Sequence, residues 1–301
     1  MEARVVAVVG PTATGKSALG IALAKALHGE VVNADSMQLY RGMDIGTAKL
    51  SEAEQEGVPH HLLDVWPVTR TASVADYQRL ARDRIAELLA RGVTPIVVGG
   101  SGLYVRAVLD KMEFPGTDAG LRAELEHELA TVGPAPLHAR LAAADPAAAQ
   151  AILPTNGRRI VRALEVITLT GRPFTAALPS YESVYDAVQI GLDLPNDVLD
   201  RRVGERVDRM FAAGLVDEVR RLEADGLRDG VTASRALGYQ QVLAMFDGAC
   251  SEEQARVETA AATRRFVRRQ RSWFGRDPRV RWLTVGPDVV ARALETVGAR
   301  S

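Results

Sequence analysis

Residues 10–17 are Gly10-Pro11-Thr12-Ala13-Thr14-Gly15-Lys16-Ser17, which matches the phosphate-binding pattern G-x-x-x-x-G-K-[ST]. The segment 4–9 before it is apolar enough for a short buried strand, and 17–28 repeats leucine at helical spacing. A strand, a glycine loop and a helix in this order direct backbone N–H groups toward a phosphate. We therefore expect a di- or triphosphate here, with Lys16 at the phosphate oxygens and the Ser17 hydroxyl as a Mg²⁺ ligand.

Strand and helix patterns alternate after this loop. The segments concerned are 30–33, 61–65, 74–91 and 94–98. The alternation predicts an α/β fold, a P-loop NTPase-like doubly wound parallel sheet that binds ligands at the carboxyl ends of its strands. Asp35, Asp64 and Ser101 would then lie at that edge of the sheet.

The alternation stops near residue 114. From about 121 to 169 the sequence is alanine-rich and helical, with breaks at Gly133-Pro134, Asp145-Pro146 and Pro154. Strand character returns at 187–192, and from Asp197 onward the pattern is helical and increasingly basic. We expect a discontinuous α/β core domain of residues 1–113 and 186–301, with a helical insertion domain of residues 114–185.

Composition excludes several classes of protein. The 301 residues carry a net charge of −1, so any binding to nucleic acid needs a local basic patch. The single cysteine excludes an internal disulfide and a cysteine-based zinc site, and His60-His61 lacks a third metal ligand at the usual spacing. No apolar run has transmembrane length and no secretory signal is recognisable, so we expect a cytoplasmic protein without a membrane partner.

Two polar segments follow predicted strands. Asp35 belongs to the segment Asn33-Ala34-Asp35-Ser36-Met37-Gln38. One interpretation makes it a functional group, either a general base or a residue that organises Mg²⁺, and the alternative makes it a helix N-cap. The segment Gly99-Gly100-Ser101 either lets a ligand or another backbone approach closely or forms a tight turn. This segment lacks the Mg²⁺-holding aspartate that motor-type NTPases usually place at the end of such a strand. Its absence disfavours nucleotide hydrolysis as the function, unless Asp64 takes the place of that aspartate.

Arginine pairs on predicted helix faces are candidates for RNA phosphates. Arg158 and Arg162 lie four residues apart with Arg159 beside them, and a solvated face is the alternative. Arg202 and Arg206 repeat this spacing, with structural ion pairs to the nearby Glu205 and Asp208 as the alternative.

The most basic segment is 263–274, which contains no acidic residue. We expect its arginines to contact nucleic acid, and the four that we select are Arg264, Arg265, Arg268 and Arg269. The aromatic residues of this segment are expected to pack into the core, with base stacking as the alternative, and they are Phe266, Trp273 and Phe274.

Taken together, these segments resemble the tRNA dimethylallyltransferases, also called tRNA isopentenylpyrophosphate transferases. The resemblance runs through nearly the whole chain, and its most specific block is 35–49. The other matching blocks are 10–17, 60–64, 98–104, 158–166, 236–239 and 269–274. Ser101 stands where the family usually has threonine, which retains a hydroxyl. No C-terminal zinc-finger extension of the eukaryotic members is present, so we expect the bacterial type.

The resemblance implies transfer of a dimethylallyl group from dimethylallyl diphosphate to N6 of an adenosine, with release of diphosphate. That adenosine lies immediately 3′ of the anticodon in tRNAs that read codons starting with U. The implied cofactor is Mg²⁺, and the implied partners of a monomeric enzyme are dimethylallyl diphosphate and the tRNA anticodon stem-loop. The target base would have to leave its stack to reach the site.

The resemblance also implies roles for individual residues. The catalytic positions are Asp35 as general base, Lys16, Ser101 and Arg206. The diphosphate-binding positions are Gly10, Pro11, Thr12, Ala13, Thr14, Gly15, Lys16 and Ser17. The tRNA-contacting positions are Asp35, Ser36, Met37, Gln38, Ser101, Arg122, Arg158, Arg159, Ile160, Val161, Arg162, Arg235, Ala236, Leu237, Gly238, Tyr239 and Gln240, and the insertion domain is expected to clasp the tRNA.

Three alternatives stay open at this point. A P-loop small-molecule kinase shares the loop and the sheet but needs neither the block 35–49 nor the basic C-terminal region. An adenylate isopentenyltransferase shares the diphosphate chemistry but accepts a nucleotide. A non-catalytic RNA-binding module accounts for the arginines but leaves residues 10–17 without a purpose.

Overall fold

The computed structural model describes residues 4–174 and 181–298. A six-stranded parallel sheet organises the core, in the order β3-β2-β4-β1-β5-β6. Its strands are β1 (Val6–Val9), β2 (Gly29–Asn33), β3 (His60–His61), β4 (Thr94–Val98), β5 (Val188–Asp193) and β6 (Val280–Thr284). The predicted α/β class with a parallel sheet is confirmed.

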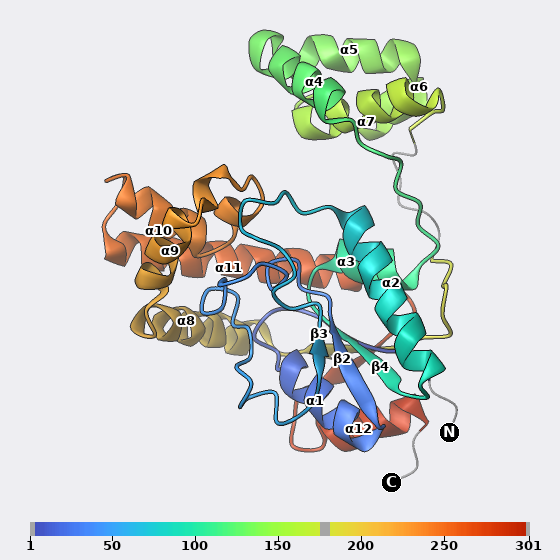
Figure 1. Ribbon diagram of the computed structural model, residues 1–301, viewed down its shortest axis with the longest axis vertical. Helices are drawn as coiled ribbons and strands as arrows, with labels where there is room; N and C mark the ends of the chain where they lie inside the picture. The colour runs from blue at the N-terminus through green and yellow to red at the C-terminus, as the bar shows by residue number, and fades with distance from the viewer. Residues whose placement is uncertain (1–3, 175–180, 299–301) are drawn as a thin grey trace. The chain divides into compact units, whose positions relative to one another are not determined.

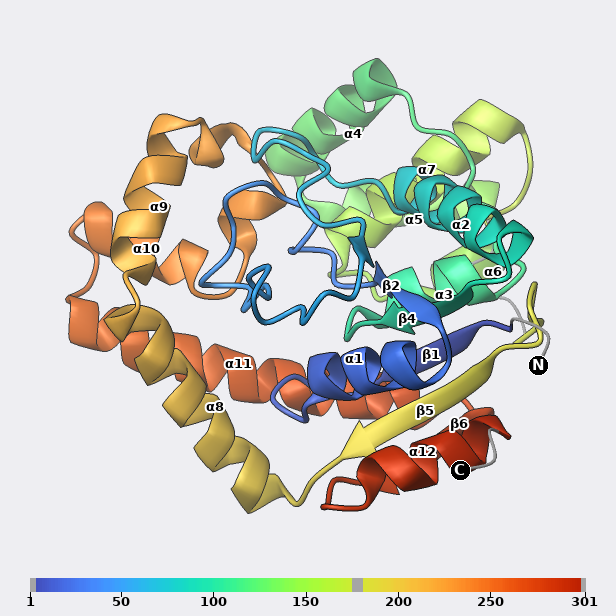
Figure 2. The same ribbon diagram turned by 60° about the horizontal axis from the view of Figure 1, so that its bottom comes forward.

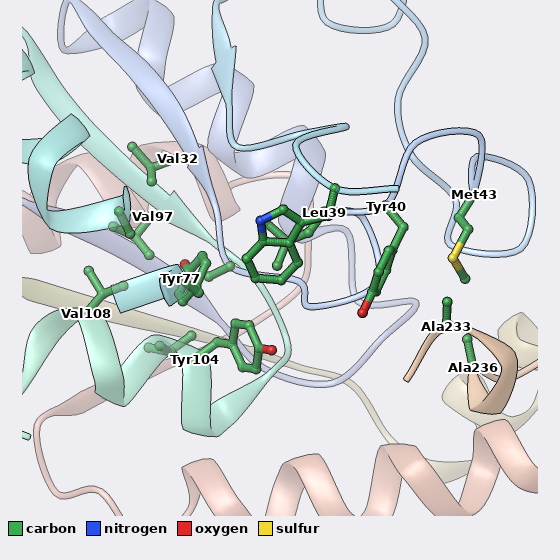
Figure 3. Packing of buried hydrophobic residues seen from close by; sticks show 14 of the residues in the cluster. Val32, Leu39, Tyr40, Met43, Tyr77, Val97, Tyr104, Val108, Ala233 and Ala236 are labelled. Carbon is green, nitrogen blue, oxygen red and sulfur yellow. The ribbon is translucent and has the colours of Figure 1, made fainter. Parts of the chain in front are cut away.

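Helices cover both faces of this sheet. The helices α1 (Lys16–Ala26) and α12 (Val289–Val297) pack on one face, while α2 (Val74–Ala90), α3 (Gly102–Leu109) and α11 (Glu252–Phe274) pack on the other. The central strands β1 and β4 are buried along their whole length, which explains their continuous apolar sequences. Figure 3 shows Tyr77 and Tyr104 near Val97 in the hydrophobic cluster on the α2 and α3 face of the sheet.

The remaining core helices follow β5 along the chain. They are α8 (Asn196–Ala212), α9 (Leu215–Ala224) and α10 (Tyr239–Phe246), with 3₁₀ turns at Leu227–Asp229 and Ala233–Arg235. The helices α8 and α11 lie side by side (Figure 2). Among the described residues, no helix combines the length and the apolar character that crossing a membrane requires.

The chain divides into two compact units, one of residues 1–110 with 183–301 and one of residues 111–182. The smaller unit holds α4 (Ala119–Val132), α5 (Pro134–Ala144), α6 (Pro146–Ala151) and α7 (Gly157–Thr170), which Figure 1 labels. These helices bury their own apolar cluster, which includes Leu125, Leu141 and Leu164. Prolines at the first positions of α5 and α6 place the helix breaks where the sequence predicts them.

Two strands differ from the sequence prediction. The predicted strand 61–65 is β3, which ends at His61, because Leu62 and Asp64 adopt positive φ angles of 63° and 58°. The prediction of helix from Asp197 onward is wrong at β6, where Val280–Thr284 pairs with β5. Only Val280 of this strand is fully buried, so local hydrophobicity gives little sign of it.

Candidate active site

Three loops meet at the carboxyl ends of the adjacent strands β2, β4 and β1. The Ala34 N–H after β2 donates to Val98 O at 2.8 Å, and the Gly99 N–H after β4 donates to Val8 O at 3.1 Å. A Cβ atom on Gly99 would lie 2.2 Å from Ala34 O, so only glycine permits this approach. The glycine after β4 therefore serves the close approach of two backbones.

The loop of residues 10–17, the P-loop, has the backbone of a phosphate cradle. Gly10, Ala13 and Gly15 adopt positive φ angles of 126°, 66° and 92°. The Thr14 hydroxyl is buried and donates to Pro11 O at 2.8 Å, which fixes the loop from within. Helix α1 begins at Lys16 without a side-chain cap, so no side chain occupies the N–H groups of its first turn.

Two cations and one carboxylate lie close together beside the P-loop, namely Lys16, Arg206 and Asp35. The Lys16 ammonium donates to Pro11 O at 2.6 Å, and the Arg206 guanidinium donates to Thr47 O at 3.3 Å. Burial and the positive charge of Arg206 lower the pKa of Lys16 to about 7, against the opposing effect of Asp35. Burial also lowers the pKa of Arg206, again opposed by Asp35. An anion placed here would relieve the repulsion between the two cations.

Asp35 lies in a turn and begins no helix, so the N-cap interpretation is wrong. Its Oδ1 accepts the Met37 N–H at 3.0 Å. Asn33 holds the backbone of Asp35 on both sides, because Asn33 Oδ1 accepts the Asp35 N–H at 2.9 Å and Asn33 Nδ2 donates to Asp35 O at 3.0 Å. Burial raises the pKa of Tyr77 and Tyr104, and the charge of Asp35 contributes to both shifts.

Ser101 joins the loop after β4 to the turn after β2. Its Oγ accepts the Ser36 N–H at 3.1 Å and lies 3.2 Å from Ser36 Oγ. Gln38 Nε2 donates to Thr47 O at 3.1 Å, the carbonyl that Arg206 also contacts. The structure thus brings together the predicted site residues of the P-loop, the turn 35–38, Ser101 and Arg206.

Contacts in the structure decide between the alternatives that the sequence leaves open for Arg206 and Asp64. Arg206 makes its hydrogen bond to Thr47 O, whereas Asp208 pairs with Arg256 at 3.9 Å, so the ion-pair interpretation of Arg206 is wrong. The Asp64 carboxylate accepts from the buried Lys49 ammonium at 2.6 Å and is occupied as an ion-pair partner.

Two further residues contact the P-loop, and Gln270 carries no role in the sequence analysis. Arg202 donates to Ala13 O at 3.4 Å, and Gln270 of α11 accepts the Thr12 N–H at 2.9 Å. Gln270 lies within the block 269–274, whose resemblance to the family is the one feature of the sequence that marks this residue. The sequence does not indicate that α11 passes the P-loop.

The basic segment of α11 is partly neutralised. Arg264 pairs with Asp200 at 3.9 Å and Arg265 with Glu258 at 2.6 Å, so the expectation of uncompensated charge is wrong for these two. Arg268 and Arg269 are exposed, and the Arg269 guanidinium makes a cation–π contact with Phe266, 5.6 Å from its ring centroid. Of the aromatic residues, Phe274 is buried in the core, and Trp273 packs against the same cluster, as expected.

Some residues predicted to contact tRNA have buried side chains. Tyr239 is fully buried, and its hydroxyl donates to Glu218 at 2.6 Å. The side chains of Ala236, Ile160 and Val161 are also buried, the last two in the insertion core. Packing holds these four side chains in the core, and the tRNA contacts expected at these positions stay a prediction. Arg158, Arg159, Arg235 and Gln240 are exposed, Leu237 is half-buried and Gly238 is buried.

Arg122 and Arg162 both bind the buried carboxylate of Glu165 in the insertion unit. Arg162 also donates to Pro115 O at 2.6 Å. Burial alone would raise the pKa of Glu165, but hydrogen bonds from Arg122 and Arg162 outweigh it and hold that pKa below its usual value. The two arginines therefore have a structural role, while each keeps about a quarter of its side chain exposed, 28% and 24%.

The oxygen donors of the site suit a magnesium ion that binds mainly through the phosphate oxygens of a substrate. The described residues contain no group of three or more His, Cys, Asp or Glu side chains placed to hold a metal. Ser17 at the start of α1 and the Asp35 carboxylate are oxygen donors, which Mg²⁺ prefers. Because Mg²⁺ usually keeps several waters and binds through substrate phosphates, few protein ligands are needed.

Comparison with known proteins gives a consistent result. The sequence profile of a family described as IPP transferase matches residues 38–277. The tRNA dimethylallyltransferase of Streptomyces coelicolor is 70% identical, over 94% of this chain and 91% of its own length. That of Thermobifida fusca is 66% identical, over 97% and 94%.

Solved structures agree with these relatives. The tRNA isopentenylpyrophosphate transferase from Bacillus halodurans is 41% identical with a TM-score of 0.74, covering 99% of this chain and 96% of its own. A eukaryotic dimethylallyltransferase acting on tRNA is 25% identical with a TM-score of 0.85, covering 99% and 81%.

Proposed function

Because the chain belongs to the IPP transferase family, we propose that it is a tRNA dimethylallyltransferase. It transfers the dimethylallyl group of dimethylallyl diphosphate to N6 of the adenosine immediately 3′ of the anticodon, in tRNAs that read codons starting with U. Diphosphate is the second product. We assign this activity to a monomer in the cytoplasm.

One observation of the structure carries the proposal. The P-loop, the turn 35–38 and the loop with Ser101 converge at one edge of the sheet, where the charge of Asp35 acts on both Lys16 and Arg206. The two cations suit a diphosphate, and the carboxylate suits a group that loses a proton. Both requirements of a prenyl transfer to an amine are thus available within one site.

The reaction forms a bond between N6 and the allylic carbon and breaks the bond from that carbon to the diphosphate oxygen. An exocyclic adenine amine is a weak nucleophile, so its placement and the removal of its proton govern the rate. Asp35 accepts the N6 proton as the bond forms. Lys16, Arg206 and the N–H groups of the P-loop stabilise the negative charge that develops on the departing diphosphate.

Magnesium fits the same site. Ser17, with phosphate oxygens and water, would hold the ion, and Mg²⁺ supplies further charge stabilisation to the diphosphate when bound. The tRNA contacts that we propose involve the turn 35–38, Ser101 and the exposed residues Arg158, Arg235 and Gln240. The insertion unit clasps the anticodon stem in this proposal.

Incubation with dimethylallyl diphosphate, Mg²⁺ and unfractionated tRNA tests the proposal, followed by mass analysis of the nucleosides. We expect an adenosine that is heavier by one dimethylallyl group. Parallel reactions offer AMP as the acceptor, or ATP with small-molecule acceptors. Prenylation of AMP but not of tRNA, or transfer of phosphate from ATP, would contradict the assignment.

The low pKa of Lys16 predicts that binding of dimethylallyl diphosphate takes up a proton. Since this pKa is about 7 in the free protein, the amine is mostly neutral at pH 8.5, and the bound anion favours its charged form. Calorimetric titration without tRNA, in two buffers of different ionisation enthalpy, should show uptake of about one proton at that pH.

The matched control for this titration is Lys16→Arg, whose guanidinium stays protonated throughout. Binding to this variant should proceed without proton uptake. In the wild-type protein, the affinity should weaken as the pH rises above about 7, because charging Lys16 then costs more. Titration of the wild-type protein with no net uptake at pH 8.5 would argue against the predicted change at Lys16.

The exposed arginines of α11 predict a salt dependence of tRNA binding. Each removed phosphate contact lowers the slope of log affinity against log salt by roughly 0.7 to 0.9, so Arg268→Ala combined with Arg269→Ala should lower it by about 1.5. The KM for tRNA should rise, while the KM for dimethylallyl diphosphate should barely change.

Arg84→Ala is the control for this double variant, because Arg84 is also helical and pairs with Glu87 at 2.7 Å on α2. It should leave the slope unchanged. A wild-type slope in the α11 double variant, measured by tRNA binding at several salt concentrations, would mean that these arginines do not contact phosphates.

A further inference from the structure

Gln270 connects two loops of the site through its side-chain amide. Its side chain is 5% exposed, on the face of α11 that packs against the core. Oε1 accepts the Thr12 N–H of the P-loop at 2.9 Å, and Nε2 donates to Gly100 O in the loop after β4 at 2.9 Å. One amide thus satisfies a backbone donor of one loop and a backbone acceptor of the other.

The surrounding glycines fit α11 closely. A Cβ atom on Gly100 would lie 2.3 Å from Gln270 Nε2, and a Cβ on Gly102 would lie 2.1 Å from Cδ1 of Trp273. Real Cβ atoms do not approach so closely, so a side chain at either glycine would displace Gln270 or Trp273 from its position. The absence of side chains at these two positions is therefore explained by the passage of α11.

No other side chain of similar length reproduces both contacts. Glutamate in its ionised form only accepts, lysine only donates, and methionine forms neither hydrogen bond of this strength. Asparagine has the right groups but is one methylene shorter. With any of these, at least one buried backbone group would lose its partner.

We propose that Gln270 is a positioning residue, which sets the spacing between the diphosphate loop and the loop that carries Ser101. The inference rests on the proposed function, because it treats these loops as the two sides of one reaction. Gly100 directly precedes Ser101, whose Oγ accepts the N–H of Ser36 next to Asp35. Gln270 thereby holds the P-loop in register with the group that accepts the N6 proton.

The expected consequence concerns turnover more than binding. A displacement of about 1 Å between reacting groups can cost on the order of 10²-fold in rate, while each loop alone can still bind its own substrate. Gln270→Met keeps the length of the side chain and removes both hydrogen bonds. We expect its kcat to fall tenfold or more (on the order of 10 to 10²) with both KM values changed by less than about threefold.

A pH profile separates positioning from general stability. Gln270→Glu keeps the acceptor for the Thr12 N–H, but its ionised form repels Gly100 O, whereas its protonated form donates to that carbonyl. Its kcat relative to wild type should therefore recover as the pH falls from 8 to 6. Gln270→Met should show no such recovery relative to wild type.

Thr259→Val is the control on the same helix, because the Thr259 hydroxyl is buried and donates to Ala255 O at 2.7 Å, about three turns from Gln270. It should change the melting temperature at most and leave kcat unchanged. All rates are measured well below the melting temperature of each variant, with tRNA and dimethylallyl diphosphate saturating.

Loss of kcat in Gln270→Met together with recovery of Gln270→Glu at low pH would support the inference. Wild-type kcat in Gln270→Met would overturn it, whether or not the melting temperature falls, and so would a Gln270→Glu ratio that is flat with pH. Lys16→Ala separates this result from failure of the proposed function: if it keeps full turnover the diphosphate site is wrong, whatever the Gln270 variants do.

Discussion

Lys16→Ala is expected to lower the turnover of tRNA prenylation by about 10²-fold or more. The substitution removes a cation at the P-loop, where negative charge develops on the departing diphosphate in a site partly shielded from water. Loss of one preorganised donor to such a charge typically costs about 10²–10³-fold in kcat. The measurement is single-turnover prenylation of tRNA at saturating dimethylallyl diphosphate.

Lys25→Ala is the matched control, since Lys25 lies on the same helix, α1, and its ammonium pairs with Glu56 at 2.5 Å on the surface. It should leave turnover within about twofold of wild type, because surface ion pairs contribute little. If Lys16→Ala also stays within about threefold of wild type, the P-loop does not bind the leaving diphosphate, and the site must be placed elsewhere.

Asp35→Asn is expected to lower the rate of the chemical step by about 10²–10⁴-fold, the range for loss of a general base. Asparagine keeps the shape of the side chain and an oxygen that can accept the Met37 N–H, as Asp35 Oδ1 does at 3.0 Å. It does not accept the N6 proton. Single-turnover rates at saturating tRNA, compared with tRNA affinity, measure the two effects separately.

Asp64→Asn provides the comparison, because Asp64 follows the neighbouring strand β3 but has its carboxylate on Lys49. We expect this variant to affect stability more than the chemical step. If Asp35→Asn loses tRNA affinity and yet reacts at the wild-type rate once tRNA is saturating, Asp35 is a binding residue and another group removes the proton.

The sequence determined the elements that depend on local rules. The P-loop follows from glycines that permit positive φ angles and from a strand and a helix whose periodicity is strong. The helix breaks at Gly133-Pro134 and Asp145-Pro146 follow from the backbone limits of proline. Local patterns of this kind need no knowledge of distant residues.

The reaction and its substrates were indicated by the resemblance to a family, and not by local patterns. Resemblance over blocks such as 35–49 indicated the reaction and its substrates, which comparison with relatives supports. Periodicity and charge alone left Asp35 undecided between a base and an N-cap. The structure excludes the N-cap interpretation, because the chain turns at 35–38 without starting a helix.

Only the tertiary structure decided which polar groups are available. Arg264 looks free of acidic neighbours within 263–274, but Asp200 of α8 reaches it through folding of the chain, whereas Glu258 pairs with Arg265 from two turns earlier on α11 itself. Strand β6 exists because β5 offers it a partner, since most of its own side chains are exposed. Gln270 lies 258 positions from Thr12 along the chain and yet accepts its N–H, because a parallel sheet gathers loops from distant segments at one edge.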